Sequence, residues 1–309
     1  MLWVFIVVES CFQDIAYGSS QLIPLRASST DIHPNAKWAQ NGITVAGGNG
    51  WGSETNQLYY PIGLYVDDDQ TIYVADWGNH RIVEWKSDAT NGTVVAGGNG
   101  QGSGAHQLNG PQDVIIDKES DSLMISDRWN NRVVRWPRRN GTRGETIISN
   151  ISSHGLTMDG NGSLYVVDDK KHEVRRYKIG YTQETVVAGG NGEGNPLNQL
   201  CNPHYVFVDR DHSVYVSDCH THRVMKWEEG AKQGIVVAEG QRKSLTQLNN
   251  PQGLVVDQLG TVYVADYYNH RIMRWSKGAT QGSVIIGGNG YGAQPNQFAS
   301  PIGLSFDRH

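Results

Sequence analysis

Aromatic and imidazole side chains gather in the turns of this 309-residue sequence, where they could contact a ligand. They follow a recurring aspartate or stand at the end of a Gly-Gly-Asn-Gly loop. Large rings on loops suit a recognition surface, because each ring contributes much contact area. The candidates for this ligand-binding face are Trp51, Trp77, Trp129, His220, Tyr267, Tyr268 and Tyr291.

Two further histidines could bind a metal ion. His154 and His204 occupy the same place in successive copies of a repeat, at the start of a strand expected to line a central channel. A catalytic zinc site uses three protein ligands, and the sequence offers two at this level. We keep the pair as a metal candidate and expect no cofactor. The equivalent residues elsewhere are Ile62, Gln112, Gln252 and Ile302.

The three cysteines are Cys11, Cys201 and Cys219. Their spacing excludes zinc-finger and RING modules, since no Cys-x-x-Cys or Cys/His ligand pattern occurs. Cys201 comes just before one strand, and Cys219 comes just after the antiparallel strand that pairs with it. Both therefore lie at the same end of neighbouring strands, and we expect a Cys201–Cys219 disulfide in an oxidising compartment.

These residues belong to a repeat whose clearest copies are 71–85 and 261–275, with looser copies at 122–136, 163–177 and 213–227. Alternating apolar residues, an aspartate, a polar turn and a second alternating run predict two antiparallel strands. A proline-led strand precedes most pairs, and a strand similar to Val-Val-Ala-Gly follows most of them; the third copy lacks the proline and the Gly-Gly-Asn-Gly loop before it. The equivalent aspartates recur every 41 to 51 residues. Four antiparallel strands at this period indicate a β-propeller blade.

Five complete units and a partial one at each end predict an all-β, six-bladed β-propeller with four-stranded antiparallel blades. The strand that starts at Ile43 and the strand that starts at Pro301 are expected to share the closing blade. The chain stops soon after Asp307, before the next two strands, so we expect an incomplete closing blade. The alternatives are that residues before 42 supply these strands, or that the gene product is truncated. The predicted domains are an N-terminal segment, 1–41, and the propeller, 42–309.

Within the repeat, some residues return in every clear copy. Asp76, Asn79, His80 and Arg81 have counterparts in other units, and repetition of this kind favours a structural role. We expect the aspartate to accept turn amides, and the arginine or histidine to bridge to the neighbouring blade. Residues that differ between units, such as Trp77 and Tyr267, are better ligand candidates.

The net charge of −5 gives no reason to expect a polyanionic partner. Units two and three do carry a local excess of basic residues. Arg138 and Arg139 nevertheless fall at the opposite end of the blade from Arg128 and Lys170, so we interpret these residues as a solvated edge. Nucleic acid is not an expected partner, and the protein is expected to be monomeric.

The apolar run from Leu2 to Val8 is too short to span a bilayer. It could be part of a signal peptide, within residues 1–18, or a buried segment. Secretion is the prediction, with a cytoplasmic location as the alternative. Four Asn-x-Ser/Thr triplets are glycosylation candidates: Asn91, Asn140, Asn150 and Asn161.

The Pro-x-Gly-Leu, Tyr-Val-Ala-Asp and Asn-His-Arg-Ile blocks, over residues 43–307, resemble the NHL-repeat family. This resemblance implies a six-bladed propeller and leaves the function open, because the fold serves several activities. A non-enzymatic module that binds a protein or peptide through its loop face is the leading prediction. One alternative is a propeller lyase or hydrolase with a channel metal, since peptidylamidoglycolate lyases of similar fold hold zinc with three histidines. Another is the substrate-recognition part of a ubiquitin-ligase system without its own RING.

Overall fold

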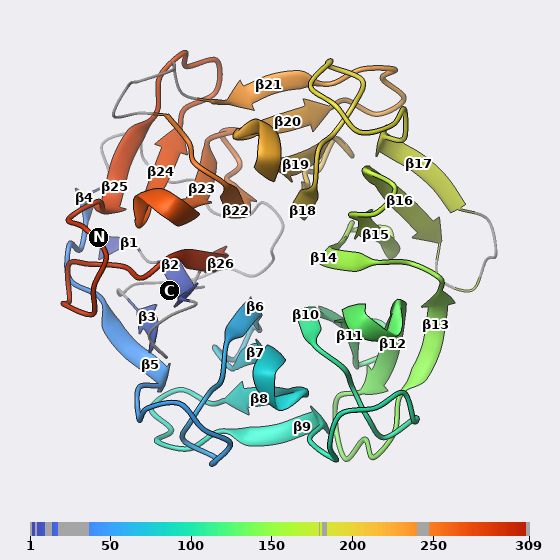
Figure 1. Cartoon of the computed structure of the whole chain (residues 1–309), viewed down its shortest axis with the longest axis vertical. Coiled ribbons are helices and arrows are strands. Elements are labelled where there is room, and N and C mark those ends of the chain that lie inside the picture. Colours follow the sequence, from blue (N-terminus) through green and yellow to red (C-terminus); the bar gives the residue numbers. More distant parts are fainter. Residues whose placement is uncertain are drawn as a thin grey trace.

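Five stretches of the chain each fold into a four-stranded antiparallel sheet, and the sheets follow one another around a ring in sequence order (Figure 1). The computed structural model describes residues 38–178, 180, 184–239 and 247–306 with their side chains, and the backbone of strands β1 to β4. We use "blade" for a sheet made of four consecutive strands. In every blade the strands lie in chain order.

Blades one to three comprise residues 61–97, 111–149 and 153–189. Blade one contains β6 (Pro61–Val66), β7 (Ile72–Asp76), β8 (Arg81–Trp85) and β9 (Thr93–Gly97). Blade two contains β10 (Pro111–Asp117), β11 (Ser122–Asp127), β12 (Arg132–Pro137) and β13 (Glu145–Ser149). Blade three contains β14 (Ser153–Met158), β15 (Ser163–Asp168), β16 (Glu173–Lys178) and β17 (Glu184–Gly189).

Blades four and five comprise residues 203–238 and 251–287. Blade four contains β18 (Pro203–Val208), β19 (Val214–Asp218), β20 (Arg223–Trp227) and β21 (Ile235–Ala238). Blade five contains β22 (Pro251–Val256), β23 (Val262–Asp266), β24 (Arg271–Trp275) and β25 (Ser283–Gly287). In four blades a single turn of 3-10 helix joins the second and third strands: η1 (Trp77–Asn79), η2 (Arg128–Asn130), η3 (Cys219–Thr221) and η4 (Tyr267–Asn269).

The predicted count of six blades is wrong, because the described chain contains five blades. The remaining four-stranded sheet, which we name the closing sheet, is a composite in the order β26-β2-β3-β5. It joins β26 (Pro301–Phe306) to β2 (Phe5–Glu9), β3 (Asp14–Tyr17) and β5 (Ile43–Gly47). A two-stranded sheet, β1 (Leu2–Trp3) with β4 (Lys37–Trp38), lies outside this set.

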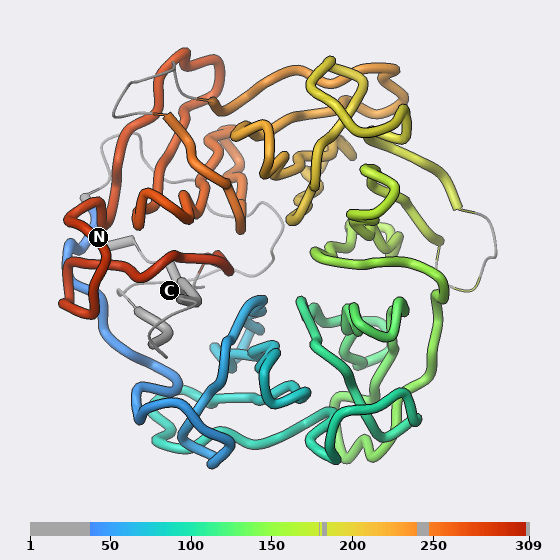
Figure 2. The backbone as a smooth tube through the Cα atoms, viewed as in Figure 1, coloured from blue at the N-terminus to red at the C-terminus, as the bar shows by residue number. Residues whose placement is uncertain are grey.

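The closing sheet also corrects the expectation that this part of the ring is incomplete. β2 pairs with β26 and with β3, and β3 pairs with β5, so two strands from before residue 42 take the two middle places. Neither strand carries the Tyr-Val-Ala-Asp or His-Arg-Ile sequence of the repeat, and therefore the repeat pattern could not identify them. Figure 2 shows the red C-terminal stretch beside the blue stretch that leads into blade one.

The core lies within and between the blades. In blade one, Leu64, Val74 and Val83 are side-by-side partners across three strands, and all three are buried. A tryptophan at or next to the end of the third strand is buried in four blades, at Trp85, Trp136, Trp227 and Trp275. Each blade presents an apolar face that only a neighbouring sheet can cover, as the repeat pattern requires.

The glycine of the Pro-x-Gly-Leu block lets neighbouring first strands approach closely. A Cβ on Gly63 would lie 2.5 Å from the carbonyl oxygen of Gln112 in blade two, and one on Gly303 would lie 2.7 Å from that of Ile62. Both contacts are with backbone, which cannot move aside cheaply. β26 and β6 therefore pack against each other as closely as the first strands of blades one and two, and this contact closes the ring. No helix of the described residues is long and apolar enough to cross a membrane.

Candidate functional site on the loop face

The turn between the second and third strands is held by a buried carboxylate. Asp76 accepts hydrogen bonds from the backbone N–H of Tyr59 at 2.7 Å, from Asn79 at 2.8 Å and from Arg81 at 2.7 Å. Arg81 also donates to the carbonyl oxygens of Ser53 and Gln57 in the preceding loop. Burial raises the pKa of Asp76, and these donors oppose that rise. Asp127, Asp218 and Asp266 repeat the arrangement, which is that of a structural residue.

In four of the five blades, the histidine before the third strand connects the blade to the next sheet. His80 has a positive φ of 53°, and its Nδ1 accepts a hydrogen bond from the backbone N–H of Gly110 at 3.1 Å. The same contact joins His172 to Asn202, His222 to Asn250 and His270 to Ser300. An imidazole nitrogen that accepts is unprotonated, and burial lowers the pKa of His80 and of His270 accordingly. The second and third strands of each blade thus supply the scaffold of the loop face.

On this scaffold, blades one and two carry a continuous group of rings that we name the aromatic cluster: Trp51, Tyr59, Tyr60, Trp77 and Trp129. Trp51 packs on Tyr60 with ring centroids 5.5 Å apart, and Trp77 packs edge-on against Trp129 at 4.7 Å. Trp51 is 56% exposed and Trp129 is 45% exposed. The structure therefore brings together three of the predicted ligand-face residues.

Tyr59 and Tyr60 were missed by the sequence reasoning, although a signal was present. They stand directly before the proline that opens a blade, where the other blades have Asn-Gly, Cys-Asn and Asn-Asn. The Tyr59 ring packs at a tilt against Tyr60, with ring centroids 4.8 Å apart, and it is partly exposed. In the turns, residues that differ between blades are the ligand candidates. Tyr59 and Tyr60 differ from their counterparts in the same way, so this position meets the same condition.

The other predicted aromatic residues form separate contacts. Tyr267 and Tyr268 pack on each other at 4.8 Å in blade five, and Tyr291 packs against His270 at 5.2 Å. Tyr268 and Tyr291 are each more than half exposed. The first pair belongs to blade five and the second joins blade five to the loop before β26, whereas the aromatic cluster belongs to blades one and two. They line the same face at a different part of the ring.

The predicted Cys201–Cys219 disulfide is not formed, since both cysteines are free thiols. Cys219 is fully buried, and its Sγ lies 2.8 Å from the carbonyl oxygen of Pro251 in the next blade. The thiol of Cys201 instead donates to Glu193 Oε1 at 3.1 Å. The two side chains point to different neighbours, which a prediction from strand order cannot reveal. Burial and the nearby Glu193 raise the pKa of Cys201 to about 11. Cys11 lies outside the described residues.

The channel histidines meet, but as a stacked pair. The rings of His154 and His204 are 4.0 Å apart and 11° from parallel. His204 contacts Gln252 through Nδ1 at 2.9 Å and Asn202 through Nε2 at 3.0 Å, so both of its nitrogens are engaged. His154 Nε2 lies 3.6 Å from Asp169. Burial lowers the pKa of His204 to about 4 and that of His154 well below its ordinary value. These residues do not fit a three-histidine metal site. The two imidazole rings meet through their flat faces, so their nitrogen atoms do not point toward a common position for an ion.

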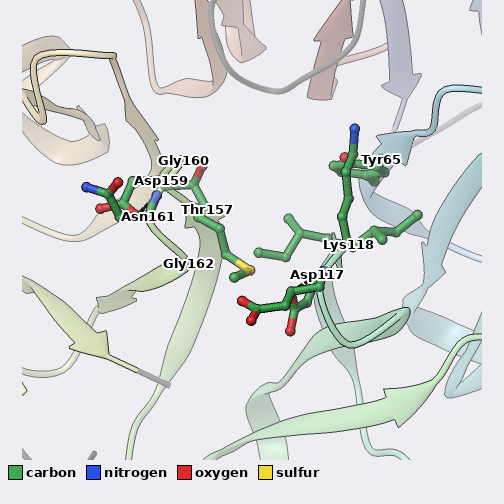
Figure 3. Close-up of a pocket in the computed structure, with 12 residues that line it drawn as sticks. Tyr65, Asp117, Lys118, Thr157, Asp159, Gly160, Asn161 and Gly162 are labelled. Atoms are coloured by element: carbon green, nitrogen blue, oxygen red, sulfur yellow. Dashed lines mark hydrogen bonds between the residues drawn. The ribbon is translucent and has the colours of Figure 1, made fainter. Parts of the chain in front are cut away.

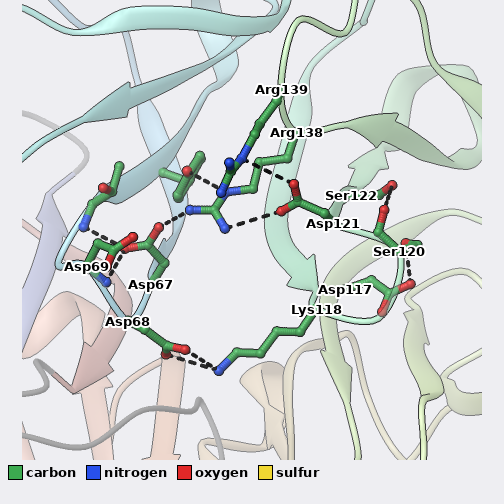
Figure 4. Close-up of polar contacts among 12 residues, drawn as sticks. Asp67, Asp68, Asp69, Asp117, Lys118, Ser120, Asp121, Ser122, Arg138 and Arg139 are labelled. Carbon is green, nitrogen blue, oxygen red and sulfur yellow. Dashed lines mark hydrogen bonds and ion pairs between the residues drawn. The ribbon is translucent and has the colours of Figure 1, made fainter.

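Most of the basic residues in blades two and three are paired with carboxylates. Arg128 pairs with Asp169 across a blade boundary, and Arg135 pairs with Glu145. Figure 4 shows Arg138 between Asp67 of blade one and Asp121 of blade two. Arg138 Nε also donates to the Tyr73 hydroxyl at 2.9 Å, and its side chain is only 18% exposed. The interpretation of Arg138 as a solvated edge residue is therefore wrong, since it is a largely buried link between blades.

A separate cavity of about 370 Å³ lies at the ends of β10 and β14 (Figure 3). Asp117, Lys118, Met158 and Asp159 are among the residues that line it. The first strand of a blade begins on the loop face and ends on the opposite one, so this cavity lies away from the aromatic cluster. Of the predicted site residues, it contains one glycosylation candidate, Asn161.

Comparisons with known structures define the class of protein as a β-propeller. A chain from the crystal structure of a nidogen/laminin complex superposes with a TM-score of 0.69 over 98% of both chains, at 14% identity. A structural-genomics protein from Bacteroides thetaiotaomicron gives 0.67, with 97% of this chain and 84% of that chain covered, at 14% identity. Streptogramin B lyase gives 0.52, with 72% and 67% covered, at 10% identity.

The profile of the NHL repeat matches residues 58–85 and 248–274. These stretches contain the Asn-His-Arg turns at Asn79 and Asn269 on which the resemblance was based. The chain therefore contains NHL repeats at these two sites, and the predicted resemblance to the NHL-repeat family is confirmed there. A sequence search of curated proteins finds no match.

Proposed function

We propose that this propeller is a non-enzymatic binding module that recognises a protein or peptide through the aromatic cluster. The observation that carries the proposal is the continuous, partly exposed group of five rings on one side of the loop face. Tryptophan and tyrosine are the residues most enriched among those that dominate protein-binding energy. Each ring can bury about 150–250 Å² with few rotatable bonds to immobilise.

The position of the cluster in the repeat supports this role. Asp76 and Arg81 build the turn and recur in other blades, whereas Trp77 and Tyr59 are replaced there by other residues. The scaffold therefore does not require these rings, which leave apolar area exposed to water at some cost. A partner that covers Trp51 and Trp129 would recover that area.

Fold-level analogy gives limited additional support. The similar chain comes from the crystal structure of a nidogen/laminin complex, so a chain of this fold is part of a protein assembly, which is consistent with a binding role. At 14% identity the likeness concerns the fold, and no residue of that interface is transferred to this chain.

The experiment compares the unaltered chain with two variants. Affinity capture first identifies a partner, and its binding is then measured with purified components. Trp51→Ala combined with Trp129→Ala is expected to weaken binding at least tenfold, since central aromatic contacts are worth about 2 kcal/mol or more. The matched control is Leu259→Ala, because Leu259 is 46% exposed but lies in the β22–β23 turn on the opposite face. Equal binding by all three proteins would exclude the aromatic cluster as the binding site.

A lyase or hydrolase that uses a channel metal has less support. Its best candidates, His154 and His204, present stacked faces, and the nitrogens of His204 are engaged by Gln252 and Asn202. Purified protein that holds a stoichiometric metal, lost when His154 and His204 are replaced together, would favour this alternative. A role beside a ubiquitin ligase gains no specific observation from the structure.

A further inference from the structure

Blade four carries three metal-ligating side chains at one point of the loop face. Ligand atoms of Glu193, Cys201 and His220 all lie within 4.8 Å of one another. We infer that these residues form a binding site for a thiophilic divalent cation, with Zn²⁺ as the expected ion. Asn202 lies between this site and the stacked channel histidines, since its Nδ2 contacts both His204 and His220, and none of the three ligands belongs to the aromatic cluster.

The backbone fixes all three positions before any ion arrives. Glu193 forms a β-bridge with Leu200, the residue before Cys201. The backbone N–H of Cys201 donates to the buried Asp218 at 2.6 Å, and the N–H of His220 donates to the Cys201 carbonyl oxygen at 3.3 Å. The ligands therefore come from a loop and a turn that the scaffold already joins, so little ordering is required.

Equivalent positions in other blades carry different chemistry. Blade one has Trp51, Tyr59 and Gly78 at these three places. Blade two has Gln101, Asn109 and Trp129, where the Gln101 amide donates to Asn109 at 2.9 Å. Since neither set contains a cysteine, a carboxylate or a histidine, the fold does not require such residues here. Their coincidence in blade four needs another explanation, and metal binding supplies one.

The donor atoms select the class of ion. A thiolate sulfur, an imidazole nitrogen and a carboxylate oxygen are the three ligand types of protein zinc sites. Calcium and magnesium take oxygen ligands almost entirely, so the thiol argues against them. Glu193 and His220 are exposed and Cys201 is partly buried. Three protein ligands at an exposed site leave a fourth tetrahedral position for water or for a side chain of a bound partner.

Neighbouring residues contact two of the ligands. Asn202 Nδ2 donates to His220 Nε2 at 3.1 Å, so this nitrogen carries no proton and would exchange the amide for the ion. His172 Nε2 lies 3.7 Å from Glu193 Oε2, while its Nδ1 accepts the backbone N–H of Asn202. An outer contact of this kind is typical beside a metal-ligating carboxylate, and the contact from His172 favours one orientation of Glu193. The hydrogen bond between Cys201 and Glu193, at 3.1 Å, would be replaced by bonds to the ion.

The test uses the full chain in a Cys11→Ser background, which removes the thiol outside the described residues. Zn²⁺ binding is measured by competition with a chelating dye, and Co²⁺ serves as a spectroscopic probe of thiolate ligation. We expect one ion per chain and a sulfur-to-cobalt charge-transfer band. Cys201→Ser and His220→Asn should each weaken binding by more than about 100-fold, since loss of an outer contact alone costs about 10- to 100-fold.

Two controls keep the result interpretable. Cys219→Ala removes the buried thiol of the same blade, and His106→Asn removes an exposed histidine from the corresponding loop of blade two. Both should bind Zn²⁺ as the background does. Circular dichroism identifies any variant that fails to fold, in which case Glu193→Gln provides the ligand deletion. No stoichiometric binding, or binding that Cys201→Ser and His220→Asn leave unchanged, would overturn the assignment.

Discussion

Blades one and four use one backbone for two kinds of chemistry. In both, an aspartate holds the residue before the proline-led strand, and an arginine pairs with that aspartate. Blade one places Trp51, Tyr59 and Gly78 on this frame, whereas blade four places Glu193, Cys201 and His220. The comparison shows that the repeat determines where side chains project, while the exceptions to the repeat determine what they can bind.

The backbone of this turn differs slightly between blades one and four. The backbone N–H of Gly78 donates to the Tyr59 carbonyl oxygen at 2.8 Å, but that of His220 donates to Cys201 at 3.3 Å. A Cβ on Gly78 would lie 2.7 Å from the same carbonyl oxygen and 2.4 Å from the Tyr59 ring. Glycine therefore lets the turn of blade one approach the tyrosine pair more closely. The aromatic cluster depends on this approach.

The largest effect is expected from removing the shared aspartate. Asp76→Ala and Asp218→Ala leave Arg81 and Arg223 buried without their carboxylates, which typically costs about 3–5 kcal/mol. Urea unfolding of both variants should show similar losses in the free energy of unfolding. A loss confined to one variant would show that the two frames are held differently, and it would weaken the comparison.

The next largest effect is expected from acid, which should destabilise blade four through His204 but has no equivalent group to protonate in blade one. His204 opens blade four with a pKa lowered to about 4 by burial, and blade one has Ile62 at that place. The unfolded chain takes up a proton near pH 6.5 and the folded histidine does not, so stability is lost as pH falls from about 6.5 to 4. The loss for His204 is on the order of 3 kcal/mol.

Unfolding measured at pH 7 and at pH 4.5, for the unaltered chain and for His204→Gln, tests this expectation. The variant retains a polar side chain near Gln252 and removes the titrating group. Its loss of stability with acid should be smaller than that of the unaltered chain. An identical loss would assign the acid sensitivity to other groups, including His154, whose pKa burial also lowers.

A smaller effect should follow from substitutions at the two turn positions. Gly78→Ala is expected to destabilise the protein by about 1–3 kcal/mol, because the new methyl group meets backbone and a packed ring. His220→Ala should change stability by less than about 0.5 kcal/mol without metal, since the side chain is exposed. Thermal unfolding in the presence of a chelator measures both. A tolerated Gly78→Ala would mean that blade one does not need the closer approach.

The smallest effect concerns the four sequon asparagines, all of which are exposed. Asn91→Gln and Asn140→Gln should change the free energy of unfolding by less than about 0.5 kcal/mol. If the chain passes through a secretory pathway, glycosidase treatment of protein from its native source should increase its gel mobility, and the variants should show a smaller change. Unchanged mobility would remove the support that these triplets give to secretion.

Much of the scaffold could be predicted from the sequence, because it repeats. The strands of the five blades, the structural role of Asp76 and Arg81 and the bridging role of His80 follow from copies that can be compared within one chain. The closing sheet could not be predicted in this way. β2 and β3 have no copy elsewhere, and their partners lie at distant positions in the sequence.

The site was predicted less completely, for a physical reason. Sequence order indicates which end of a strand a residue occupies, but not the direction in which its side chain turns. Cys201 and Cys219 do occupy neighbouring strand ends, yet one thiol faces Glu193 and the other faces Pro251. The sequence did not predict the group of Glu193, Cys201 and His220, because these residues are separated in the chain and match no metal-binding motif.

The closing sheet has a consequence for the order of folding during synthesis. Each blade is completed within one short stretch of chain, whereas Phe5 pairs with Phe306, about 300 positions later. We therefore expect the five blades to form as they emerge from the ribosome, while the edge of the apolar strand β2 that does not face β3 lacks its partner until β26 arrives. Stalled nascent chains that end before Pro301 should expose β2 to proteolysis, and protection at that stage would contradict this order. Closure of the ring is then the last step of folding.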